Sequence, residues 1–153
     1  APAPNSTGVR PVLHLPVHQD KNYPAHKRPS NIVPDVLAGG RDAEILAAFM
    51  PAGNRALDEF RPDMLFYVGG ADPYVEDQLG GLQLTKEGLK RRDREVFEAA
   101  RARGIPVTTA LAGGYARNVA ATVAIHINTI IAAREVAEKY PQSTARHSQA
   151  ATR

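Results

Sequence analysis

One short segment of the sequence places a carboxylate where an α/β protein keeps its reactive groups. Residues 64–68 are consecutively apolar and run into Gly69 and Gly70, after which come Asp72 and Pro73. A run without a polar face predicts a buried parallel strand, central in its sheet, with helices on both faces. Because Pro73 restricts Asp72 to extended conformations, the carboxylate is held at the carboxyl end of this strand. A held carboxylate is suited to binding a metal ion.

A second glycine-rich turn carries a phenol. Residues 106–111 form the next predicted strand, which runs into Gly113, Gly114 and Tyr115. The helix between the two strands spans residues 86–103, so the unit is a parallel strand-helix-strand crossover. Parallel strands end at the same edge of a sheet, and we therefore expect Asp72 and Tyr115 to face one cavity.

Helices and caps complete the expected α/β fold. Residues 42–60 have helical apolar spacing interrupted by Pro51 and Gly53, which predicts a kinked helix or two short ones. Val12–Val17 is a candidate short strand. Asn118 can cap the last helix, whose expected buried stripe is Val119, Val123, Ile127, Ile130 and Ile131.

The crossover helix carries clear boundary signals. Thr85 is the expected N-cap, with Leu84 and Leu89 at the positions of a hydrophobic staple. Asp93 lies on the apolar stripe, where a boundary salt bridge with a neighbouring arginine is favoured over a buried polar anchor. His126, beside the last stripe, is expected to be structural because no second ligand stands at metal spacing from it.

Composition narrows the class of protein. The 153 residues include 19 basic and 16 acidic side chains, a formal net charge of +3, and no cysteine. Disulfides and thiolate metal sites are therefore excluded, and a metal would need His, Asp or Glu. No apolar run approaches the roughly 20 residues of a bilayer span. We expect a soluble, cytoplasmic protein with no membrane partner, and no nucleic-acid motif accompanies the positive charge.

Two separate motifs resemble the zinc-dependent histone deacetylase superfamily, most closely its class IV and bacterial members. They are the segment Arg61–Asp93, with its Gly-Ala-Asp-Pro and Leu-Gly turns, and the segment Ala112–Ala116. The resemblance covers Val12–Tyr140 and implies a three-layer α/β/α fold with a mainly parallel, arginase/deacetylase-like sheet. It implies that residues 9–140 are the carboxyl-terminal part of a catalytic domain. The small, proline-rich residues 1–8 have the composition of a flexible arm, and residues 141–153 that of a disordered tail.

The family resemblance also assigns roles. Asp72 would be one of three protein ligands to a catalytic zinc, which polarises an acetyl carbonyl and activates water. Tyr115 would donate its hydroxyl to that carbonyl, with Gly113 and Gly114 lining the pocket. The loop after the first strand places His18 beside the active-site entrance, although a solvent-facing loop histidine is the commoner case.

Two further positions bear on the site. Many relatives bind a monovalent cation through a serine two residues before the entrance histidine, whereas Pro16 stands there and has no hydroxyl. A potassium ion is therefore doubtful at this place. Asp77, in the turn after the strand at residues 64–68, is expected to be a turn carboxylate or a support for the site.

Other parts of the family's machinery do not occur in this sequence. No Asp-x-His and no His-His pair is present among the 153 residues, so two zinc ligands and the general base would come from a missing amino-terminal portion of the domain. The chain by itself is thus expected to be an inactive carboxyl-terminal part, truncated at its amino-terminal side. The complete enzyme would act on an acetylated lysine peptide or a small acetylated amine.

Two rival functions remain open at this point. The chain could be a catalytically silent remnant that acts as a binding or assembly module. It could also be a nucleotide-binding α/β module, but the bulky Tyr115 follows Gly113 and Gly114 where a phosphate loop needs small residues.

Overall fold

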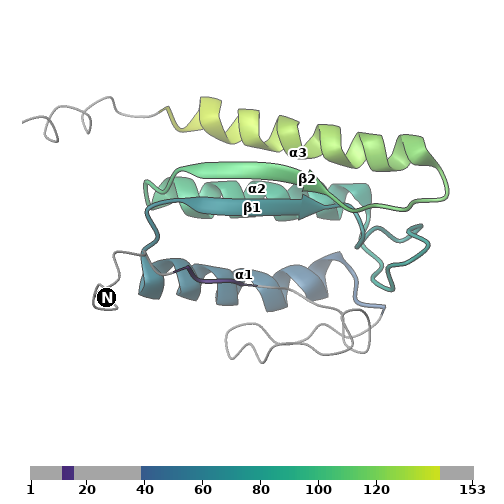
Figure 1. The fold of residues 1–153 in the computed structure, drawn as a ribbon, viewed down its shortest axis with the longest axis horizontal. Coiled ribbons are helices and arrows are strands. Elements are labelled where there is room, and N and C mark those ends of the chain that lie inside the picture. The colour runs from purple at the N-terminus through teal and green to yellow at the C-terminus, as the bar shows by residue number, and fades with distance from the viewer. Residues whose placement is uncertain (1–11, 16–38, 142–153) are drawn as a thin grey trace, which may run out of the picture.

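The protein is seen in a computed structural model that describes residues 12–15 and 39–141. Five elements follow one another in the described chain: α1 (Asp42–Phe60), β1 (Leu65–Gly70), α2 (Lys86–Ala102), β2 (Val107–Ala112) and α3 (Val119–Lys139). The two strands pair in parallel, in a register that begins with Leu65 opposite Val107. The predicted parallel strand-helix-strand unit is confirmed, and the fold class is α/β (Figure 1).

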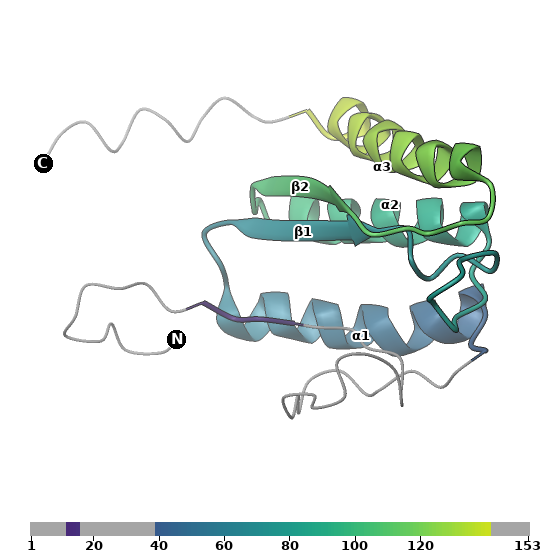
Figure 2. The same cartoon turned by 45° about the vertical axis from the view of Figure 1, so that its right-hand side comes forward.

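Helices cover one face of this two-stranded sheet. Figures 1 and 2 place α2 behind the strands, with α1 and α3 on either side of it. Tyr67 packs edge-on against Phe97 of α2, with ring centroids 5.6 Å apart, in a cluster that includes Ala132 and Val136 of α3. On the opposite face, Phe66 is 72% exposed and Val68 is 64% exposed. The described chain therefore does not cover both faces of β1, contrary to the sequence prediction.

α1 is one continuous helix, which agrees with the single-helix alternative of the prediction and excludes the alternative of two short helices. Pro51 and Gly53 both lie inside it. Pro51 has no N–H to donate to the carbonyl of Ala47. Ala47 and Pro51 are both exposed, so water can bind the Ala47 carbonyl instead. The first turn of α1 also holds α2, because the Asp42 carboxylate accepts from the Thr85 amide at 2.8 Å and from its hydroxyl at 2.7 Å.

The boundary signals of α2 are confirmed. The Thr85 hydroxyl accepts from the Gly88 amide at 2.9 Å, and the staple residues Leu84 and Leu89 are completely buried. A Cβ at Gly88 would overlap the Asp42 carboxylate in the position where that carboxylate accepts from Thr85. The cap and the contact with α1 thus fix the same turn.

α3 starts where the sequence predicts but buries a different face. The Asn118 side chain caps it by accepting from the Ala120 amide at 3.0 Å. Four of the five predicted stripe residues are at least half exposed: Val119, Val123, Ile127 and Ile130. The buried residues are Ala121, Ile125, Thr129, Ala132 and Val136. The apolar residues of α3 lie on all sides of the helix. The small side chains among the buried ones allow α3 to approach α2 closely.

Several predictions fall at the edge of the described chain or beyond it. Residues 12–15 do not form a strand, so the predicted strand is not found in its described part. The arm at 1–8, Pro16, His18 and all but the first residue of the tail at 141–153 lie outside the described residues. By length and composition α3 is a candidate membrane span among the described residues, and 28% of its apolar window is buried. Its contacts are mainly with α2.

Candidate functional site

The loops that follow β1 and β2 lie together at one end of the sheet (Figure 2). The strand pairing continues past its last register position, because the Ala71 amide donates to the Ala112 carbonyl at 3.1 Å. Beyond it, the Gly114 amide donates to Asp72 Oδ1 at 2.8 Å. This bond joins the aspartate loop to the Gly-Gly-Tyr loop, as the parallel crossover predicts.

Three glycine positions make room for Asp72. A Cβ at Gly70 would come within 2.7 Å of Asp72 Oδ2, and a Cβ at Gly113 would overlap the carboxylate. Gly113 also has a φ of 58°, in the left-handed region that suits glycine. At Gly80 a Cβ would overlap the backbone carbonyl oxygen of Asp72. The carboxylate therefore rests against bare backbone on several sides while Asp72 as a residue stays exposed.

The Asp77 carboxylate joins the loop after β1 to the Gly-Gly-Tyr loop after β2. Its Oδ1 accepts from the amides of Leu79 at 2.9 Å and Gly80 at 2.7 Å, while its Oδ2 accepts from the Tyr115 amide at 2.6 Å. The residue is buried. The expected turn role of Asp77 is confirmed, and the bond to Tyr115 adds a contact that no local sequence pattern indicates.

Tyr115 has a fixed backbone and an exposed side chain. Its carbonyl accepts from both the backbone and side-chain amides of Gln78, at 3.1 and 3.0 Å. The side chain is 59% exposed, so it is available to a ligand. His126 Nε2 lies 3.3 Å from the Gly113 carbonyl of the same loop, which agrees with a structural role for that histidine.

Replacing Asp77 by asparagine is expected to loosen both loops. Whichever way the amide is oriented, its NH2 group faces a backbone N–H that now has no acceptor. A buried donor left in this state costs about 1–3 kcal/mol, which urea unfolding would measure. Glu59→Gln is the control, because Glu59 is exposed on α1. Equal stability of the two variants would contradict a joining role for Asp77.

The described residues do not by themselves complete a metal site. Within residues 12–15 and 39–141, no group of three or more His, Cys, Asp or Glu side chains could hold an ion. A catalytic zinc commonly takes three protein ligands. Asp72 offers one oxygen, Oδ2, that is not engaged by the Gly114 amide. The described chain can thus supply one ligand of a zinc site but does not complete the site.

The fold and the loops define an α/β protein with an acidic group and a phenol at the carboxyl edge of parallel strands. Residues 9–131 match the histone deacetylase domain family. The chain belongs to this family, as its two motifs indicated.

Two relatives give the extent of the similarity. An uncharacterized protein of Picosynechococcus sp. is 35% identical over 128 residues, which are 82% of this chain and 42% of that protein. Histone deacetylase 2 of Arabidopsis thaliana is 29% identical over 122 residues, 78% of this chain and 32% of that protein. The chain therefore spans less than half the length of either relative.

The structure also shows what sequence reasoning missed. Asp93 is 0% exposed, so its assignment to the boundary was wrong and the buried-anchor alternative holds, although it does pair with Arg92 as expected. Arg92 donates to the Gly70 carbonyl at 3.0 Å, directly behind the Asp72 loop. The only sequence signal for this contact was a pair of charged residues on an apolar helical stripe.

Proposed function

We propose that this chain supplies one zinc ligand and the carbonyl-binding phenol of a deacetylase that removes acetyl groups from acetyl-lysine or a small acetylated amine. The observation that carries the proposal is the 2.8 Å bond from the Gly114 amide to Asp72. It joins the two family motifs at one edge of the sheet, although 42 residues separate them in the sequence. Membership of the histone deacetylase family supports the same reading.

Each side chain has a distinct part in the proposed chemistry. Asp72 Oδ1 is fixed by the Gly114 amide, which leaves Oδ2 to face a cation. The Tyr115 backbone is held by Asp77 while the residue is largely exposed, so its hydroxyl can donate to an acetyl carbonyl. Bound zinc would supply Lewis-acid polarisation and an activated water.

The remaining ligands and the general base are proposed to come from the rest of the domain. One carboxylate does not hold a catalytic zinc, and the sequence contains no Asp-x-His. The same portion would cover the open sheet face at Phe66 and Val68, both largely exposed here. Covering that face with helices would complete the three-layer arrangement.

Zinc content of an assembled domain tests this proposal. The part of the Picosynechococcus relative that its alignment with this chain leaves out would be expressed as a fusion to this chain. The fusion is expected to hold about one zinc per molecule and to deacetylate an acetyl-lysine peptide. Asp72→Asn should remove the zinc and the turnover together, because the amide replaces a carboxylate ligand.

Asp58→Asn is the matched control. Asp58 is an exposed aspartate on α1 that pairs with Arg103, away from the glycine loops, and its variant should keep both zinc and activity. A fusion that holds no zinc would contradict the proposal, as would an Asp72→Asn fusion that keeps its zinc. Deacetylation by the 153-residue chain without the added part would contradict the need for completion.

A binding or assembly module is the second candidate. Large exposed apolar patches on a soluble domain commonly mark contact surfaces, and the open face of β1 presents Phe66 and Val68. Under this reading the fusion would assemble through the same face but bind no zinc. Metal content therefore separates the two candidates.

A further inference from the structure

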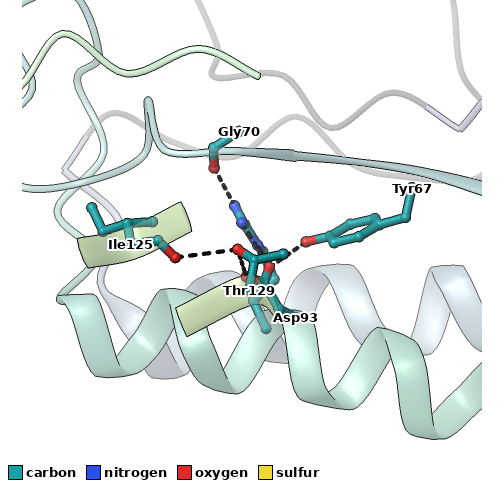
Figure 3. A network of polar contacts seen from close by, with 6 residues as sticks. Tyr67, Gly70, Asp93, Ile125 and Thr129 are labelled. Atoms are coloured by element: carbon teal, nitrogen blue, oxygen red, sulfur yellow. Dashed lines mark hydrogen bonds and ion pairs between the residues drawn. The ribbon is translucent and has the colours of Figure 1, made fainter. Parts of the chain in front are cut away.

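A buried polar network lies between the sheet and the helices behind the Asp72 loop (Figure 3). At its centre is Asp93 of α2, which is 0% exposed. Its carboxylate accepts from the Tyr67 hydroxyl at 2.5 Å, from the Thr129 hydroxyl at 2.6 Å and from Arg92 Nε at 2.9 Å. The network thus joins β1, α2 and α3 through one side chain.

The pKa values of both Tyr67 and Arg92 are raised in this network. Burial raises the pKa of Tyr67, and the charge of Arg92 only partly opposes that effect, so the phenol remains a donor to Asp93. Burial opposes the charge of Arg92, but the adjacent Asp93 carboxylate favours it, and the pKa of the guanidinium is raised. Arg92 Nη2 lies 2.8 Å from Asp93 Oδ1 without hydrogen-bond alignment.

The guanidinium also reaches out of the network toward the site. Arg92 Nη1 donates to the carbonyl of Gly70 at 3.0 Å. Gly70 is the last residue of β1, two positions before Asp72, and is one of the glycines whose Cβ would approach the Asp72 carboxylate. The orientation of the Gly70 peptide therefore sets both the exit direction of the chain and the surface against which that carboxylate rests.

We propose that Arg92, oriented by Asp93, is a positioning residue for Asp72. Asp93 fixes the guanidinium from one side through Nε, and the guanidinium fixes the Gly70 peptide from the other through Nη1. The Asp72 carboxylate then meets the Gly114 amide. The consequence for metal binding rests on the proposed function, whereas the consequence for the bond between Asp72 and Gly114 does not.

The Gly114 amide resonance tests the positioning role in the 153-residue chain. Asp72→Asn first identifies how the amide proton responds to the change of its acceptor. Arg92→Met is then expected to shift that proton toward the Asp72→Asn position and to speed its exchange by about 10- to 150-fold, the range for loss of one charge-assisted hydrogen bond. Arg92→Lys keeps a charge near Asp93 and should give an intermediate shift, which preserves the test if the methionine variant does not fold.

Two controls separate positioning from stability. Arg91→Met removes an exposed arginine of the same helix, whose partner is Glu95, and should leave the Gly114 resonance unchanged. Phe97→Leu weakens the core behind the sheet without touching the Gly70 carbonyl, so it should lower stability without the shift. The proposal is overturned if the Gly114 amide proton keeps its shift in both Arg92→Lys and Arg92→Met. It is also overturned if Phe97→Leu shifts this proton equally, or if Asp72→Asn does not shift it.

A second readout follows from the zinc-bearing fusion. There, Arg92→Lys is expected to weaken zinc affinity about 10- to 100-fold, the range for groups that orient a metal ligand. If the unmodified fusion binds no zinc, the proposed function fails while the Gly114 resonance still decides the role of Arg92. If zinc binds equally well in both proteins, the positioning role fails and the proposed function stands.

Discussion

Tyr115→Phe in the zinc-bearing fusion is expected to lower the rate of deacetylation by about 100- to 1,000-fold, as loss of a single oxyanion donor does at comparable sites. The substitution removes only the hydroxyl. The backbone of Tyr115 would stay fixed, because Asp77 and Gln78 hold it through main-chain atoms. Zinc content and the unfolding transition should therefore match those of the unmodified fusion.

Tyr140→Phe provides the matched control for this result. Tyr140 is also exposed but lies at the far end of α3, where loss of a hydroxyl should not alter turnover. Steady-state rates on one acetyl-lysine peptide would compare the two variants. A Tyr115→Phe fusion that keeps full activity would show that the phenol does not contact the reacting carbonyl.

Asp93→Ala is expected to destabilise the chain by about 3–5 kcal/mol, the range for removing one partner of a buried ion pair. The loss leaves the Arg92 guanidinium buried without its counter-charge, and it deprives the hydroxyls of Tyr67 and Thr129 of their acceptor. Urea unfolding followed by circular dichroism measures the effect. Glu95→Ala on the same helix removes only a partner of the exposed Arg91 and should cost about 1 kcal/mol or less.

The double variant Arg92→Met with Asp93→Leu distinguishes stability from positioning. Replacing a buried ion pair by apolar residues of similar volume is often neutral or stabilising, so the pair should be more stable than Asp93→Ala. The Gly70 carbonyl would still lack its donor, and the Gly114 resonance should stay displaced. A double variant as unstable as Asp93→Ala would mean that the cost does not come from the unpaired charge.

The open face of the sheet explains one failed expectation. The apolar run at residues 64–68 predicts burial on both faces, and the side of β1 that bears Tyr67 does pack against α2 and α3. The side that bears Phe66 and Val68 does not. Sequence pattern reports the environment for which a strand is suited, whereas exposure depends on which polypeptide lies against it.

The predicted buried face of α3 was wrong for another reason. Its apolar residues are distributed around the helix, so spacing gives no unique buried face. The structure selects the side with Ala121, Ile125 and Ala132, because small residues there permit close contact with α2. The exposed side retains Val123 and Ile127. Helix existence and its Asn118 cap were local properties, but its orientation depended on the partner helix.

The sequence by itself determined the local features of this protein: the strand ends, the Thr85 and Asn118 caps, the glycine turns and the two motifs of its family. Each depends on residues within a few positions of one another. Only the tertiary structure decided that Gly114 donates to Asp72, that Asp77 joins Tyr115 to its own turn, and that Arg92 reaches Gly70. These contacts cross 42, 38 and 22 positions. The first two exist because parallel pairing in one register brings the ends of β1 and β2 together, and the third exists because α2 packs against β1.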